Sequence, residues 1–193
     1  MNVSAIIVTR GGVNLDPCFD TMPEHWERIV WDNSAETDLS VYGRYAAIEA
    51  YASHDLCFVQ DDDVIVSDPQ AIVDGDYGIT RGGEVLVANM PQEFRPHYPD
   101  SCLVGFGSCF HRDAPSRAFA RFEEEAGEAY IEKSPFFHRT CDVVFTTLTT
   151  RVLVDVPVTH REFASDSDRM WKQPGHVEER VRMLELARKV RDA

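Results

Sequence analysis

The chain has 193 residues, 44% of them hydrophobic, and a formal net charge of -14 at pH 7. This length fits one domain with a sizeable core, and the negative charge argues against a general nucleic-acid binder, which needs clustered Lys and Arg. No apolar run approaches the roughly 20 residues of a membrane span, and the N-terminus lacks the pattern of a signal peptide, so we expect a cytoplasmic protein. The five cysteines form no CxxC pair, which predicts reduced core residues rather than disulfides or a zinc site.

Two strand-like segments open the chain. Val3–Thr9 is rich in β-branched residues and predicts a strand, and Arg10–Gly12 follows it as a turn. The turn matches neither GxGxxG nor GxxxxGK[ST], so the dinucleotide-binding and P-loop interpretations fail. Arg28–Trp31 predicts a second strand. Asp32–Ser34 ends it with groups that either form a turn or bond a base or ribose, and the sequence favours neither.

A helix is predicted over Tyr42–Ala52 by its alanine content, with Arg44 near the amino end. An arginine in the first turn opposes the helix dipole. Arg44 therefore indicates a salt bridge or an anionic ligand rather than a contribution to helix stability.

Three consecutive carboxylates, Asp61–Asp63, lie between two apolar segments near the end of the first third of the chain. They follow the apolar run Leu56–Val59 and precede Val64–Val66, which predicts a core strand that delivers the acids at its carboxyl end, where open α/β sheets bind ligands. Acids this close repel one another unless a cation screens them, and a divalent ion with open positions could also take up phosphate oxygens. The alternative is a solvated acidic turn. Such a turn would not need apolar flanks, so we favour the metal site.

The middle of the chain predicts further β structure and a loop. Asp68–Val73 predicts a short helix, and Tyr77–Thr80 with Glu84–Ala88 predicts a strand pair around a tight turn. Met90–Asp100 contains three prolines and predicts an extended loop, of a length that often faces a ligand. Together with the β/α alternation of the first half, these segments predict an α/β fold with a mixed sheet.

A strand is predicted over Ser101–Val104, and the glycines of Gly105–Ser108 then allow close approach of the backbone. That approach suits either a ligand wall or a β-bulge. Ala114–Ala126 predicts an amphipathic helix whose three glutamates face solvent.

The last third contains one acid inside a mainly apolar segment, Asp142 within Ser134–Leu148. A buried acid needs a partner, so Asp142 either bonds backbone amides in the core or faces the metal site. Arg151–Val156 predicts the final strand, and Thr159–Pro174 shows little periodicity. A C-terminal helix follows from about Val177.

That C-terminal helix carries a stripe of Val177, Val181, Leu184 and Val190. His176 stands at its start, directly after a Pro-Gly turn. A lone histidine is more often structural than a ligand, but this position leaves it free to reach inward.

The sequence resembles the GT-A glycosyltransferases, the nucleotide-sugar-dependent class whose mixed, Rossmann-like sheet is flanked by helices and carries a DxD acid motif. The resemblance covers most of the chain and rests on ordered features: IIVT, VWDNS, YGRYAAI, QDDDVIV, GFGSCFHRD, RTCDVVF and PGH. The most similar subgroups are the compact exostosin-like catalytic domain and small phage-encoded transferases, which would act in the host cytoplasm. The resemblance implies one GT-A domain over 1–193, with a nucleotide-binding half at about 1–89, an acceptor-binding half at about 90–175 and a C-terminal helix at about 176–193.

By this resemblance, donor contacts fall on the first half of the chain. Thr9 and Arg10 would line the nucleotide pocket, and Asp32 and Asn33 would contact base or ribose. Arg44 would approach the sugar or diphosphate.

The resemblance also implies the reacting groups. Asp63 and His176 would hold Mn²⁺ or Mg²⁺, while Asp61 would contact ribose or sugar and Asp62 the donor sugar. Asp142 would be the catalytic acid. The family commonly has two adjacent acids in that segment, whereas Cys141 precedes Asp142 here. The acceptor wall would be formed by Gly105, Phe106, Gly107 and Ser108.

The implied reaction transfers a sugar from a nucleoside-diphosphate sugar, with a UDP-sugar favoured, to a hydroxyl of a saccharide or of a hydroxymethylated pyrimidine in phage DNA. The metal would neutralise the leaving diphosphate. Asp142 would act as general base in an inverting enzyme or stabilise the oxocarbenium-like state in a retaining one. The alternatives are a sugar-phosphate nucleotidyltransferase, which would need a longer Gly-rich loop than Arg10–Gly12, a non-catalytic metal- or nucleotide-binding module, and a hydrolase with paired carboxylates.

Overall fold

The computed structural model describes residues 1–75, 85–127, 134–161 and 172–193. At its centre is a six-stranded mixed sheet with the strand order β2-β1-β3-β6-β5-β7. β6 runs antiparallel to both of its neighbours, whereas β2, β1 and β3 pair in parallel, as do β5 and β7. The strands are β1 (Ser4–Thr9), β2 (Glu27–Asp32), β3 (Leu56–Asp61), β5 (Val85–Asn89), β6 (Ser108–His111) and β7 (Thr150–Val154).

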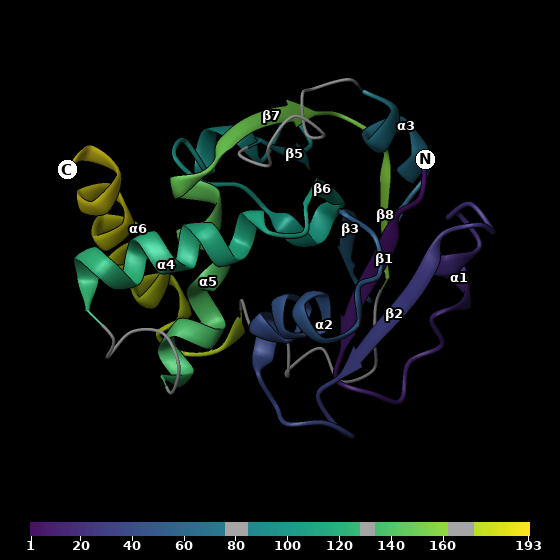
Figure 1. Cartoon of the computed structure of the whole chain (residues 1–193), viewed down its shortest axis with the longest axis horizontal. Helices are drawn as coiled ribbons and strands as arrows, with labels where there is room; N and C mark the ends of the chain where they lie inside the picture. The colour runs from purple at the N-terminus through teal and green to yellow at the C-terminus, as the bar shows by residue number, and fades with distance from the viewer. Residues whose placement is uncertain (76–84, 128–133, 162–171) are drawn as a thin grey trace.

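Helices flank this sheet on both faces, and Figure 1 shows α4, α5 and α6 gathered at the end of the molecule opposite β1, β2 and α1. The α-helices are α1 (Asp16–Phe19), α2 (Gly43–Tyr51), α3 (Pro69–Asp74), α4 (Ala114–Ala126), α5 (Pro135–Leu148) and α6 (His176–Asp192). Short 3-10 helices are η1 (Ser40–Tyr42), η3 (Arg95–His97) and η4 (Val104–Phe106).

Alternate side chains of β1 enter two separate cores. Ile6 and Val8 pack with residues of α2, α4, α5 and α6, whereas Ala5 and Ile7 pack with residues of α1, α3 and β4. A strand buried on both faces reads as a continuous apolar run, which is why this segment shows no polar alternation. The α/β, Rossmann-like fold with a mixed sheet that the sequence predicts is confirmed.

A second, two-stranded sheet holds the acidic turn in place. β4 (Val64–Val66) pairs antiparallel with β8 (Val158–His160), although the sequence predicts little structure over Thr159–Pro174. The amide of Arg161 donates to the carbonyl of Asp63 at 2.8 Å, so the pairing extends to the turn itself. Three-residue strands are too short to show a pattern, and β8 forms because β4 offers it a partner.

The predicted strand over Ser101–Val104 is wrong. Residues 101–103 form neither helix nor strand, and the chain then turns through η4 before β6 begins. Two features explain this course: the amide of Cys102 is bonded to the Thr146 hydroxyl of α5 rather than to a strand, and Gly107 has a φ of 98°. The apolar residues of this segment are buried by helix packing, and not by strand pairing.

The remaining elements lie close to their predicted ranges. The segment Tyr77–Thr80 of the predicted strand pair lies outside the described residues, while its partner corresponds to β5. On α6 the predicted stripe is only partly buried, because Val177 is 65% exposed and Val181 is 52% exposed. All five cysteines are buried and free, as predicted. Over the described ranges, no helix combines the length and the apolar character that crossing a membrane requires.

Candidate functional site

The polar residues that end the first three strands meet at one edge of the sheet. In the register of the parallel strands Thr9 lies opposite Asp32, and Val8 lies opposite Asp61. This is the edge at which ligands bind in open α/β sheets. The sequence therefore places the acids correctly relative to the sheet, because strand pairing fixes where each strand ends.

Arg44 joins two acids that come from distant parts of the chain. Its side chain is 1% exposed, and it donates from Nη2 to Asp61 Oδ1 at 2.7 Å and from Nη1 to Asp142 Oδ2 at 3.1 Å. Of the two interpretations of this arginine, the salt bridge is present and links the end of β3 to α5. A buried pair of this kind persists only when further hydrogen bonds satisfy its charges.

Tyr45 supplies one of those bonds. Its hydroxyl donates to Asp142 Oδ1 at 2.7 Å, so both oxygens of that carboxylate are held. Burial, together with the neighbouring charge of Asp142, raises the pKa of Tyr45 well above its ordinary value, which keeps the phenol protonated and donating. Asp142 thus bonds side chains and lines a cavity, rather than bonding backbone amides in the core.

Opposing effects of its surroundings act on the pKa of Asp61. Burial raises the pKa of Asp61 to about 7, even though the Arg44 guanidinium opposes this shift. The nearby acids Asp63, Asp142 and Asp62 raise it further. A cation bound beside these carboxylates would favour their ionised forms.

Gly105 packs directly against Asp61. A Cβ at this position would lie 1.9 Å from Asp61 Oδ2, which no real contact allows. Gly105 and Phe106 line the cavity, whereas Gly107 and Ser108 do not. Ser108 is buried as the first residue of β6. Of the four predicted acceptor-wall residues, the structure brings two to the cavity.

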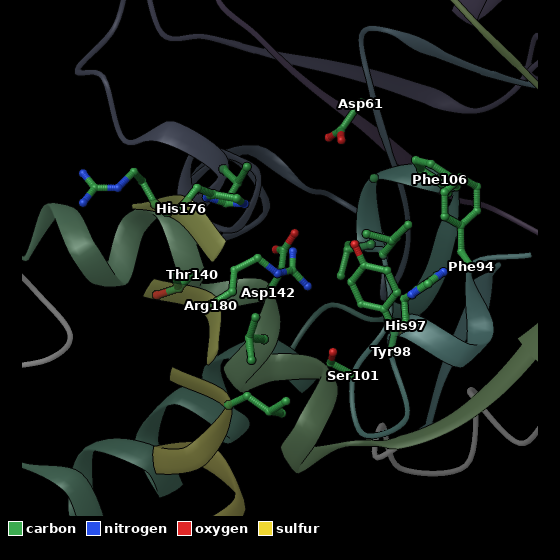
Figure 2. A pocket seen from close by; sticks show the side chains of 18 of the residues that line it. Asp61, Phe94, His97, Tyr98, Ser101, Phe106, Thr140, Asp142, His176 and Arg180 are labelled. Atoms are coloured by element: carbon green, nitrogen blue, oxygen red, sulfur yellow. The ribbon is translucent and has the colours of Figure 1, made fainter. Parts of the chain in front are cut away.

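The cavity beside these acids has a volume of 780 Å³. Asp61 and Asp63 bound it from the acidic turn, α5 and α6 form a second wall, and the segment around η3 forms a third. Figure 2 shows Asp61 at one border of the cavity, with aromatic side chains on one side and His176 and Thr140 on the other. A cavity of this size accommodates a small-molecule substrate.

The residues proposed to hold a metal both reach this cavity. His176 is 8% exposed, and its Nδ1 has no hydrogen-bond partner among the residues that the structure describes. Burial, with help from the charge of Arg180, lowers the pKa of His176, and the neutral imidazole is the form that binds metals. Within the described ranges no three His, Cys, Asp or Glu side chains form a ready-made metal site. Mg²⁺ commonly binds one or two carboxylates and completes its shell with waters and substrate phosphates, so Asp63 fits such an ion in chemical type. The imidazole of His176 is a nitrogen ligand, which fits a softer divalent ion better than Mg²⁺.

Of the predicted donor contacts, Arg44 and Asp61 line the cavity, whereas Asp32 and Asn33 do not and already have internal partners. Asp32 Oδ1 accepts from both the amide and the hydroxyl of Ser34, which is an Asx-type turn. Asn33 Oδ1 accepts from Trp31 Nε1 and from the amide of Leu39, while its Nδ2 donates to the carbonyl of Ser40. Asp32 and Asn33 therefore form a turn, which is one of the two alternatives that the sequence left open.

Thr9, Arg10 and Asp62 also lie away from the cavity. Burial raises the pKa of Asp62, and a hydrogen bond with the Thr9 hydroxyl opposes that shift. Asp62 therefore faces β1, whereas Asp61 and Asp63 line the cavity.

Several cavity residues could not be selected from the sequence. Tyr98 follows η3 in the loop predicted to face a ligand, but nothing distinguishes it there from its neighbours. Arg180 had one available signal: it stands four residues after His176, so both occupy the same face of α6.

Comparisons with known proteins bear on the fold. No protein-family model and no curated protein matches this sequence. The structure is similar to the crystal structure of A197 from STIV, with a TM-score of 0.53 and 14% identity, over 84% of this chain and 87% of that chain. At this identity the likeness concerns the fold alone.

Proposed function

We propose that this chain is a metal-dependent glycosyltransferase, which transfers a sugar from a nucleoside-diphosphate sugar to an acceptor hydroxyl. The observation that carries the proposal is the double contact of Arg44 with Asp61 and Asp142. It couples the acid that ends β3 to an acid on the cavity's helical wall. The arginine fixes the spacing of two carboxylates beside a substrate-sized cavity.

The donor's diphosphate would lie at the acidic turn. Asp63 and His176 would hold the Mn²⁺ or Mg²⁺ ion, which when bound supplies Lewis-acid stabilisation of the negative charge on the leaving phosphate. The nucleotide would lie along the ends of β1 and β2, at Thr9, Arg10, Asp32 and Asn33. We favour a UDP-sugar as the donor and a cytoplasmic site of action.

Asp142 would act on the acceptor. Arg44 and Tyr45 each occupy one lone pair of its carboxylate, and the second pair of each oxygen remains for the acceptor hydroxyl. The two bonds also fix the orientation of the carboxylate, which is the main requirement for proton transfer. In an inverting enzyme Asp142 would take the hydroxyl proton, and in a retaining enzyme it would stabilise the developing positive charge. The hydroxyl would belong to a saccharide or to a hydroxymethylated pyrimidine.

Calorimetric titration of UDP and of GDP, each with and without Mn²⁺, tests this proposal. The intact protein should bind one of them only with the metal, and Asp63→Ala should weaken that binding by at least about tenfold. Asp155→Ala is the matched control, because Asp155 is exposed and lies outside the cavity. No nucleotide binding in any combination would contradict the proposal. Binding of Mn²⁺ alone would favour a non-catalytic metal-binding module instead.

A further inference from the structure

The cavity contains a cation that no acid of the described chain neutralises. Three arginines line it, and two have carboxylate partners: Arg44 as given above, and Arg139 with Glu179. Arg180 forms neither an ion pair nor a hydrogen bond with any residue that the structure describes. Its contact is with an aromatic ring, since its Cζ lies 5.0 Å from the centre of Tyr98.

A guanidinium stacked on a ring is prepared for an anion. The ring covers one side of the guanidinium, and the N–H groups at its edges match the two oxygens of a carboxylate or phosphate. Figure 2 shows Arg180 between His176 and the aromatic side chains of the cavity. Arg180 is also only partly exposed, so its charge is less well hydrated than that of a surface arginine.

The rest of the cavity limits where an anion can lie. Asp61, Asp63 and Asp142 bound it on other sides and repel negative charge. An anionic group is therefore directed to the α6 wall. The same wall carries exposed apolar side chains of α6 such as Val181, and Asp142 lines the same cavity.

Thr9, Asp32 and Asn33, which are assigned to the nucleoside part of the donor, do not line the cavity, whereas Asp63 and His176, assigned to the metal at its diphosphate, do. We propose that Arg180, stacked on Tyr98, binds a carboxylate or phosphate group of the acceptor substrate. The acceptor is then a hydroxyl compound that carries an anionic group. The identification of this ligand as the acceptor rests on the glycosyltransferase proposal. The binding of an anion at Arg180 does not depend on it.

Ligand-observed NMR titrations of the full chain in EDTA test this inference, because EDTA removes the metal that could bind an anion elsewhere. The probes are phenyl phosphate and benzoate, with benzyl alcohol as the uncharged comparison. At least one anionic probe should bind more tightly than benzyl alcohol, and Arg180→Gln should weaken it by at least about tenfold. Tighter binding of phenyl phosphate would identify a phosphate as the preferred group, and tighter binding of benzoate would identify a carboxylate.

Arg182→Gln provides the matched control. Arg182 lies on the same helix and stacks on Phe136 at 5.4 Å, but it does not line the cavity. Its substitution should leave probe binding unchanged, and both variants should unfold at similar temperatures. Equal losses in the two variants, no loss in Arg180→Gln, or no anion binding by the intact protein would each overturn the inference.

The two proposals fail separately. If the nucleotide titration fails while the anionic probe binds at Arg180, the glycosyltransferase proposal falls and the anion site stands. If UDP or GDP binds with Mn²⁺ but neither anionic probe binds, the anion site alone is wrong.

Discussion

Arg44 Nη2 lies 2.7 Å from Asp61 Oδ1, at the point where β3 ends and the acidic turn begins. The same guanidinium holds Asp142 on α5, which is 98 residues further along the chain. A single buried cation thus sets the distance between the turn and the helical wall. The geometry of the candidate site depends on this one side chain more than on any other.

Arg44→Met should therefore destabilise the protein by about 3–5 kcal/mol, because it leaves two partly buried carboxylates without their cation. Urea unfolding followed by circular dichroism measures the loss. Arg139→Met is the control, since Arg139 also lines the cavity but pairs with Glu179 near the surface. Its loss should stay within about 1 kcal/mol. Similar losses of unfolding free energy in both variants would show that the buried salt bridge contributes no more to stability than the surface one.

Gly105→Ala should disturb the acidic turn. The new methyl group would overlap Asp61 Oδ2, so either the carboxylate or the backbone must move, at a cost of about 1–3 kcal/mol. We expect a lower unfolding temperature and weaker Mn²⁺-dependent nucleotide binding. Ser101→Ala changes another cavity residue without reaching Asp61 and should preserve both. Unchanged nucleotide affinity in Gly105→Ala would separate Asp61 from donor binding.

Two substitutions of Asn33 separate its structural role from a role in nucleotide binding. Asn33→Ala removes the side-chain hydrogen bonds with Trp31, Leu39 and Ser40 and should cost about 1–3 kcal/mol of unfolding free energy. Asn33→Asp keeps the oxygen that accepts from Trp31 and Leu39 but loses the donor to the Ser40 carbonyl, so its loss should be smaller. If Asn33 also contacts the base, Asn33→Asp should weaken nucleotide binding despite its better stability. Equal affinity for the nucleotide in the two variants and the intact protein would restrict Asn33 to the turn.

The stability contributed by the ion pairs between Asp100 and α6 should depend on pH. Asp100 pairs with Arg188 and with Arg191, and hydrogen bonds from these arginines lower the pKa of Asp100. As the pH falls below about 4, the unfolded chain therefore takes up this proton before the folded chain does, and the stabilisation present at higher pH is lost. The side chains are 29% to 39% exposed, so the pair contributes at most about 1 kcal/mol.

Thermal unfolding of Asp100→Asn between pH 3 and pH 7 tests whether the contribution of Asp100 to stability is lost at low pH. The variant should be less stable than the intact protein at pH 7, and the two should converge near pH 3. Asp155→Asn changes an exposed acid that has no ion pair with any residue the structure describes, so it should follow the intact protein throughout. A constant difference across the range would assign the effect to packing and not to charge.

The parts of the fold that the sequence predicts are those set by local pattern. The apolar runs of β1 and β3 identify a doubly covered sheet, and Asp61 follows the second of them directly, so its place at the sheet edge is determined. The helix with Arg44 is equally visible, and the conflict with the helix dipole indicates correctly that the arginine has a partner. The identity of that partner is not visible, because Asp142 lies on another element and no local rule joins them.

The parts that the sequence misses depend on neighbours. Ser101–Val104 has the composition of a strand but is buried under α5, whereas β8 has almost no pattern and forms because β4 is available. Arg180 and Tyr98 become a pair only when α6 packs beside the loop that follows η3. Contacts of this kind decide the shape of the cavity, and side-chain types alone do not predict them.

The pairing of β4 with β8 has a consequence for biosynthesis. The three acids are translated in the first third of the chain, but the strand that fastens their turn follows almost 100 residues later. The acids therefore leave the ribosome well before β8 is synthesised. At that stage the residues of β1, β2 and β3 have all been translated, whereas the strand that pairs with β4 has not. The pairing that fastens the acidic turn can form only after β8 has left the ribosome.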